Sequence, residues 1–169
     1  MTSFRDLWIW QESHKLMLEI HQFAKSLPRE ERFRKRDQIE RSSSSVPDNI
    51  AEGYTAYYYN EKIKGMLIAR REAGETQNHV EALFGKQYLP RSRADAWINR
   101  YERIMAGINS YVNYVNEKRD NDSRKGKGKG YPVNRRSGTR LSGDLEIRDV
   151  PDLRISGSSS PGYPDSRIS

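Results

Sequence analysis

Apolar positions recur at steps of three and four residues along most of the chain, which is the spacing of an amphipathic α-helix. The pattern falls into four segments that are separated by proline, asparagine or serine. The clearest of them steps regularly through Trp97, Tyr101, Ile104, Ile108, Tyr111 and Val115. The pattern predicts four helices, over about residues 4–27, 29–58, 61–89 and 92–118.

Short connections between these segments favour antiparallel neighbours, because a short loop returns the chain along the helix that it has just left. We therefore expect an all-α fold, an antiparallel up-and-down four-helix bundle over residues 1–118. Residues 119–169 contain seven of the twelve glycines and four of the seven prolines, but neither Trp nor Phe. Such a segment buries too little apolar surface to offset its ordering entropy. We expect a disordered C-terminal tail.

The second predicted helix has an unusual centre, the stretch QIERSSSSVPDNIAEG. One face of it contains small residues, so a neighbouring backbone can approach closely. Pro47 lacks a backbone donor and is expected to kink the helix. Hydroxyls of Ser42 to Ser45 are expected to bond the carbonyls that Pro47 frees. The residues of the small face are Ile39, Ser43, Val46, Ile50 and Gly53.

Three clusters of residues resemble the signature of the four-helix-bundle family encoded in intervening sequences of bacterial 23S ribosomal RNA genes. They are Phe4, Asp6, Leu7, Trp10 and Gln11; Pro28, Glu31 and Phe33; and Gln38, Ile39, Arg41, Ser45, Val46, Pro47, Asn49, Ile50, Ala51, Glu52 and Gly53. The family is similar in fold to accessory proteins of diversity-generating retroelements. The resemblance implies an up-and-down bundle, a homopentameric ring and a role near nucleic acid without known catalysis.

The net charge of +7 and the isoelectric point near 9.6 favour an anionic partner, and nucleic acid is the commonest one. The alternative is that a basic composition only keeps a small protein in solution. No recognition motif is present, so we expect RNA or DNA to be bound with little sequence specificity. The candidate residues are Arg32, Arg34, Lys35 and Arg36, a weaker pair, Lys62 and Lys64, and, in the tail, Arg124, Lys125, Lys127, Lys129, Arg135 and Arg136.

Aromatic and apolar residues outside the main stripes are candidates for a subunit interface of a homo-oligomer. Trp8 and Ile9 lie partly off the first stripe, and Tyr57, Tyr58 and Tyr59 crowd the end of the second segment. The alternative for Trp8 and Ile9 is burial against another helix of the same chain. For the tyrosines it is packing in a loop or stacking on a base.

Residues for enzyme chemistry or metal binding do not stand out. The chain has no cysteine, His14 and His21 are two helical turns apart, and Glu75 with His79 lacks a third ligand. We therefore expect no catalysis, metal or cofactor. No apolar run reaches the roughly 20 residues of a membrane span, and the N-terminus lacks a secretory pattern, so we expect a cytoplasmic protein.

Three hypotheses for function follow from these patterns, and a small enzyme is the least favoured of them because no catalytic constellation stands out. The first is a non-enzymatic, homo-oligomeric bundle, pentameric by resemblance, that binds nucleic acid through basic surface patches. The second is a protein-interaction scaffold, which by resemblance includes an accessory subunit of a reverse transcriptase in a diversity-generating retroelement.

Overall fold

The computed structural model describes residues 3–126, which are helical over most of their length and contain no strand. A short 3-10 helix precedes the first long helix, and a 3-10 turn with a π-helical turn precedes the second. The predicted all-α fold is confirmed. The elements are η1 (Phe4–Asp6), α1 (Trp8–Ala24), η2 (Arg29–Glu31), η3 (Arg32–Arg36), α2 (Asp37–Thr55), α3 (Tyr59–Gly85) and α4 (Arg91–Arg124).

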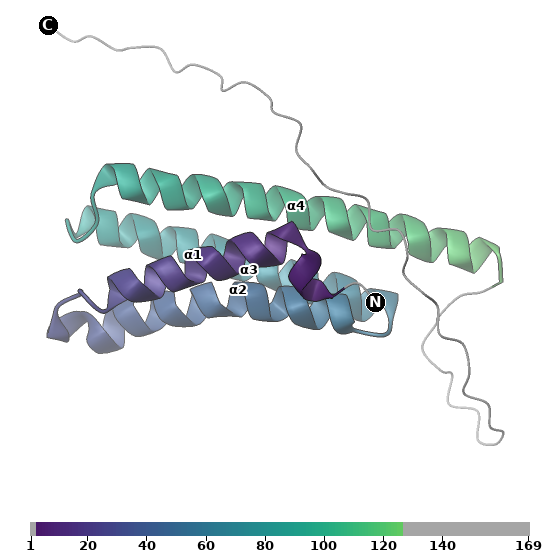
Figure 1. Cartoon of the computed structure of the whole chain (residues 1–169), viewed down its shortest axis with the longest axis horizontal. Coiled ribbons are helices and arrows are strands. Elements are labelled where there is room, and N and C mark those ends of the chain that lie inside the picture. The colour runs from purple at the N-terminus through teal and green to yellow at the C-terminus, as the bar shows by residue number, and fades with distance from the viewer. Residues whose placement is uncertain (1–2, 127–169) are drawn as a thin grey trace, which may run out of the picture.

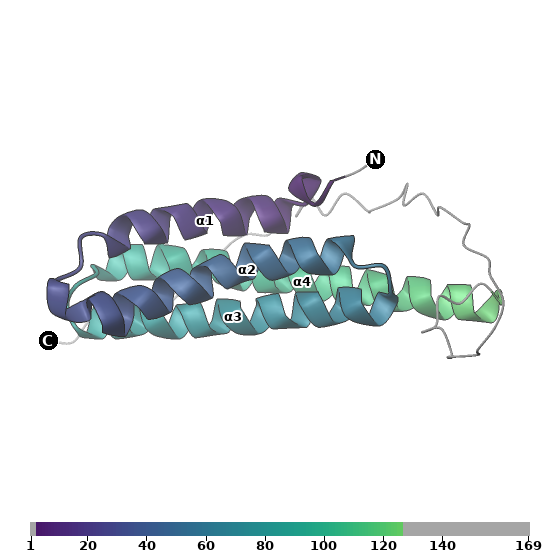
Figure 2. The ribbon, with the colours of Figure 1, turned by 90° about the horizontal axis from the view of Figure 1, so that it is seen from below.

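The four long helices run side by side in alternating directions (Figure 1). Helix α2 packs against α1 and α3, α3 also packs against α4, and contacts between α1 and α4 close the ring. This is the expected antiparallel up-and-down bundle. Figure 2 shows that the C-terminal part of α4 projects past the connection between α2 and α3. Within the described residues, no helix is both long and apolar enough to cross a membrane.

The core lies between the helices and takes apolar side chains from all four. Leu16 and Ile20 of α1, Ile50 of α2, Met66 of α3 and Ile104 of α4 are fully buried. The regular stripe of the fourth predicted helix is buried throughout, as its spacing indicated: Trp97, Tyr101, Ile104, Ile108, Tyr111 and Val115.

The N-terminal capping box is present but caps a shorter element than expected. Ser3 N–H donates to Asp6 Oδ2 at 2.8 Å, and Ser3 Oγ accepts from Arg5 N–H at 3.2 Å. Leu7 then adopts an extended backbone, so these bonds stabilise η1, and α1 begins at Trp8. The extended residue lets the chain turn from η1 into α1.

The serine run of α2 does not act on the carbonyl that Pro47 frees, which corrects the expectation above. Pro47 leaves the Ser43 carbonyl without its helical donor. The hydroxyls of Ser43 and Ser44 instead donate to the Glu40 carbonyl, at 3.2 and 2.8 Å. They therefore bond to carbonyls of the preceding turn.

Helices α2 and α3 approach each other most closely at two glycines. A Cβ atom on Gly53 would lie 2.9 Å from the Lys62 carbonyl oxygen, and one on Gly65 would lie 2.6 Å from the Gly53 Cα atom. Real Cβ atoms essentially never come this close to backbone atoms. The small face of α2 is thus a tight helix contact, as the sequence indicated, with Gly65 as its partner on α3.

Several predicted helix boundaries were wrong. Helix α1 (Trp8–Ala24) is shorter at both ends than expected, and α3 (Tyr59–Gly85) ends four residues earlier than expected. Helix α2 ends at Thr55, since Ala56 leaves the helical conformation, and α4 continues past the expected end at residue 118 to Arg124. Residues 119–124 therefore belong to the bundle and not to the tail. Residues 127–169, for which we predicted disorder, lie outside the described residues.

The two glycines Gly65 and Gly74 of α3 allow a matched test of the close contact. Gly65→Ala places a methyl group against the α2 backbone, and we expect this overpacking to cost roughly 1 to 3 kcal/mol. A Cβ on Gly74 meets nothing within 4 Å. Gly74→Ala is expected to stabilise the helix by up to about 1 kcal/mol, because alanine has the higher helix propensity. Chemical denaturation of both variants measures the difference, and equal midpoints would show that the contact tolerates a side chain.

Candidate nucleic-acid interface

The start of the second helical segment is irregular, and this irregularity determines which side chains reach solvent. After the 3-10 turn η2, the Asp37 N–H donates to the Arg32 carbonyl, a π-helical bond that widens the turn by one residue. Glu31 is buried at the same place, and its Oε1 accepts from Lys86 Nζ at 2.5 Å. This ion pair ties the segment to the C-terminal end of α3.

Beyond Glu31, three consecutive side chains point to solvent: Arg32, Phe33 and Arg34. Phe33 is 78% exposed, the most exposed large hydrophobic side chain among residues 3–126. The Arg32 guanidinium carbon lies 5.3 Å from the centre of the Phe33 ring. We call Arg32, Phe33, Arg34, Lys35 and Arg36 the η3 patch; it joins one open aromatic ring to four cations.

Phe33 was not among the residues that the sequence suggested for binding. It was named only as part of the family signature and was assigned neither to the core nor to the surface. The sequence feature that could have indicated a binding role is that Phe33 is an aromatic residue inside the otherwise basic run RFRKR. An aromatic residue enclosed by cations on both sides is typical of surfaces that stack bases and contact phosphates.

The inner edge of the η3 patch is more constrained than its outer edge. Lys35 and Arg36 are half-buried, and Arg36 Nε donates to Glu40 Oε1 at 3.0 Å. One turn further, Arg41 pairs with Glu75 of α3 at 2.9 Å. Arg32 and Arg34, on the outer edge, are exposed and form no ion pair among the described residues, although Arg32 lies over the Phe33 ring.

His79 of α3 lies beneath this inner edge and is almost completely buried. Its Nε2 atom is 3.5 Å from Glu75 Oε1, but neither ring nitrogen has a hydrogen-bond partner among the described residues. Burial lowers the pKa of His79, the positive charges of Lys35 and Arg41 lower it further, and Glu75 opposes them. His79 is therefore held in its neutral form near neutral pH.

The structure gives the two lysines of the weaker predicted pair, Lys62 and Lys64, different environments. Lys62 is only 8% exposed, and its Nζ donates to the Tyr54 carbonyl at 2.6 Å. It stabilises the C-terminal end of α2, so its prediction as a surface cation was wrong. Lys64 is exposed.

Lys64 lines a groove between α3 and α4, which we call the α3–α4 groove. Leu67, which is 49% exposed, lies in its floor. The groove combines apolar side chains with cations and amides, and no carboxylate of the part of the chain that the structure describes lines it. Its residues are Asn60, Ile63, Lys64, Leu67, Ile68, Arg71, Asn116 and Arg119.

The predicted tail cations fall into two groups. Arg124 and Lys125 are exposed at the projecting end of α4. The η3 patch lies at the opposite end of the bundle, near the connections from α1 to α2 and from α3 to α4 (Figure 1). The other group, Lys127, Lys129, Arg135 and Arg136, lies outside the described residues and stays a prediction.

Two of the predicted interface residues belong to the core of the single chain. Ile9 is 1% exposed and packs with Trp8 against α4, where Gly107 leaves room for both side chains. Tyr59 is 8% exposed, and its hydroxyl donates to Asp122. The alternative of packing within the chain is correct for Ile9, and Tyr59 ties the start of α3 to α4.

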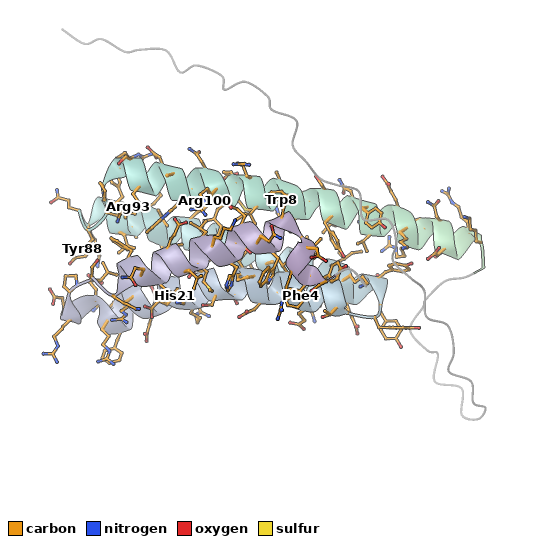
Figure 3. All side chains as sticks on the ribbon, in the orientation of Figure 1. Phe4, Trp8, His21, Tyr88, Arg93 and Arg100 are labelled. Carbon is orange, nitrogen blue, oxygen red and sulfur yellow. The ribbon has the colours of Figure 1, made fainter. Side chains whose placement is uncertain are left out.

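Three interface candidates remain nearer to the surface. Trp8 is half-buried between α1 and α4, where Arg100 bonds Glu12 at 2.5 Å and Glu19 at 2.7 Å (Figure 3). Tyr57 is 60% exposed and stands edge-on to Tyr58, with 5.1 Å between ring centres.

The histidines of α1 have structural roles. His14 stacks on Trp10 with ring centres 4.9 Å apart, and His21 Nε2 lies 3.1 Å from both the Glu40 carbonyl and the Ser44 hydroxyl (Figure 3). Across residues 3–126, no three His, Asp or Glu side chains come close enough together to hold a metal ion.

Comparison with known proteins identifies the family. A family model described as 23S rRNA-intervening sequence protein matches residues 5–110. The chain belongs to this family. Among solved structures, it is similar to a protein of unknown function from the S23 ribosomal protein family of Bacteroides thetaiotaomicron, with 27% identity and a TM-score of 0.58. That similarity covers 62% of this chain and 95% of the other. No curated protein matches the chain.

Family membership accounts for most of the bundle but not for all of the surfaces described here. The matched residues 5–110 include the whole η3 patch. Asn116 and Arg119 of the α3–α4 groove follow the end of the match.

The lowered pKa of His79 predicts a pH dependence of stability with a definite sign. In the unfolded chain His79 takes up a proton near its ordinary pKa of about 6.5, whereas in the folded chain it does so only at lower pH. The unfolded state therefore binds more protons below about pH 6.5, and stability falls as the pH drops through that range. We expect His79→Gln to reduce this loss. Urea denaturation gives the free energy of unfolding of both proteins at about pH 7.5 and pH 5.5. If the drop in this free energy between the two pH values is the same for both proteins, the assignment to His79 is wrong.

Proposed function

We propose that this member of the 23S rRNA-intervening sequence protein family is a non-catalytic, self-associating bundle that binds single-stranded nucleic acid through the η3 patch. One observation supports this most strongly: Phe33 is 78% exposed between Arg32 and Arg34. Covering an exposed apolar ring with a partner is favourable, because it removes the ring from water. Flanking cations suit a partner that offers both a flat apolar face and negative charge.

Single-stranded RNA or DNA offers both features. Bases stack on aromatic rings with little sequence preference, and phosphates pair with arginine and lysine. A duplex does not fit the ring as well, because its bases are already stacked on one another. The η3 patch has one ring and no element shaped for a groove, so the binding we propose reads little sequence.

Self-association would multiply a weak site. The resemblance implies a pentamer, and Tyr57, exposed at the α2–α3 connection, is an apolar side chain suited to a contact between copies. A ring of copies presents several η3 patches to one strand. Binding at one patch raises the local concentration of the strand at the next, so affinity exceeds that of a single site.

Two sets of substitutions separate stacking from charge in a binding titration with a fluorescent oligouridylate. Phe33→Ala should weaken binding by roughly 5- to 150-fold, because one base–aromatic stack contributes about 1 to 3 kcal/mol, and should leave the salt slope unchanged. Replacing Arg32 and Arg34 by Gln should reduce the log–log salt slope by about 1.4, since each lost phosphate contact on a single strand removes about 0.7.

Leu18→Ala is the matched control for the loss of an exposed apolar side chain. Leu18 is 53% exposed on α1 and lies outside the η3 patch. Its replacement should leave affinity unchanged, whereas an equal loss for Leu18→Ala and Phe33→Ala would remove the role assigned to the ring. If the unaltered protein binds neither oligouridylate nor oligothymidylate at low salt, the scaffold hypothesis, including the reverse-transcriptase accessory role, replaces this proposal.

A further inference from the structure

The α3–α4 groove has a different chemistry from the η3 patch. Its apolar floor is formed by Ile63, Leu67 and Ile68, and cations stand around it. Leu67 leaves about half of its surface in water, although α4 lies beside it. Such a surface fits a peptide in which apolar and acidic side chains alternate, because both kinds of side chain then find a complement.

The cations of the groove remain available for such a peptide. Lys64 is exposed and forms no ion pair among the described residues. Arg71 and Arg119 each bond a carboxylate of the next residue, Glu72 and Asp120, both at 3.2 Å. The Arg119–Asp120 pair is exposed and contributes little, whereas Arg71 holds the buried carboxylate of Glu72. An arginine has five N–H donors, so both guanidinium groups can still donate to a further carboxylate.

The chain itself contains a peptide of this composition, DLEIRDVPDL at residues 144–153. It contains four of the five acidic residues that follow Gly126, with a single arginine among them. Its apolar residues are Leu145, Ile147, Val150 and Leu153, interleaved with the acids. Pro151 is unfavourable inside a helix or a central strand, so an extended peptide in a groove suits this sequence.

The connection to the groove is short enough. Arg119 lies on α4 seven residues before Gly126, or roughly 10 Å along the helix axis. The groove extends along α3 from Asn60 to Arg71, roughly 16 Å. The 17 residues from 127 to 143 reach up to about 60 Å when extended. A tether of this length holds a tail segment near its own groove at an effective concentration on the order of millimolar.

We propose that residues 144–153 bind in the α3–α4 groove of the same chain. The apolar side chains of the segment lie on Leu67 and its neighbours, and its carboxylates pair with Lys64, Arg71 and Arg119. The bound segment covers Lys64, which the sequence suggested as a nucleic-acid contact, and leaves the η3 patch at the other end of the bundle open. The acidic segment thus competes with nucleic acid for Lys64.

Disulfide trapping in the full-length chain tests the proposal directly, because the natural sequence contains no cysteine. The double variant Leu67→Cys with Val150→Cys places one cysteine in the groove and one in the acidic segment. The protein is oxidised mildly in the absence of nucleic acid. We expect an intrachain disulfide at a rate independent of protein concentration, at least about tenfold faster than in two controls. One control pairs Leu18→Cys with Val150→Cys, since Leu18 is exposed to a similar extent on another face. The other pairs Leu67→Cys with Ser158→Cys, beyond the acidic segment.

Charge reversal shows whether the carboxylates are recognised. Lys64→Glu with Arg119→Glu should slow trapping to the rate of the controls. Lys64 is exposed and Arg119 pairs with the exposed carboxylate of Asp120, so neither change leaves a buried charge unpaired. Adding Glu146→Lys and Asp149→Lys to the charge-reversed protein should restore trapping. Equal rates in the double variant Leu67→Cys with Val150→Cys and in the controls would overturn the proposal, and so would a disulfide that forms only between chains. Neither result depends on Phe33, so the proposed function is judged separately.

Discussion

The contact between Gly53 and Gly65 fixes how α2 and α3 lie against each other. Because neither residue has a side chain, the two backbones meet directly, and a shift of either helix by one residue would bring a side chain into backbone atoms. The other bonds along this interface depend on that register. Thr76 Oγ1 donates to Ser42 Oγ at 2.9 Å, and Lys62 reaches the Tyr54 carbonyl. The register also brings Glu75 to Arg41, so it organises the base of the η3 patch as well.

The η3 patch is exposed because the regular helix begins only at Asp37. In a regular helix extended back to residue 29, residues 32 to 36 would follow one another around the axis, and some would face the core. The 3-10 and π-helical turns change the directions in which these side chains point, so that residues 32 to 34 face solvent and Glu31 is buried. A buried carboxylate is unfavourable unless it is paired, and Lys86 supplies the pair. The exposure of Phe33 thus depends on a contact made more than fifty residues later in the chain.

The features that could be predicted from the sequence are those that depend on local spacing. The four helices and the buried stripe from Trp97 to Val115 follow from a period that neighbouring residues define. Gly53 was found by the same rule, but Gly65, its partner on another helix, was not. Burial of Lys62 and Ile9 depends on neighbours distant in sequence, and the exposure of Phe33 depends on the 3-10 and π-helical turns that precede α2. The interface predictions were wrong at Ile9 for this reason: an off-stripe residue still meets a core where Gly107 gives it room.

The two proposed anion-binding surfaces differ in how they relate to the family. The η3 patch lies wholly within residues 5–110, the part of the chain that matches the family model, and its geometry depends on contacts inside that part, such as Glu31 with Lys86. The α3–α4 groove is completed by residues after the match, and its proposed ligand lies later still. A function that members of the family share is therefore expected at the η3 patch. A property particular to this chain is expected where α4 continues past the match and the tail begins, because only there can the added residues contact the bundle without disturbing the contact between α2 and α3.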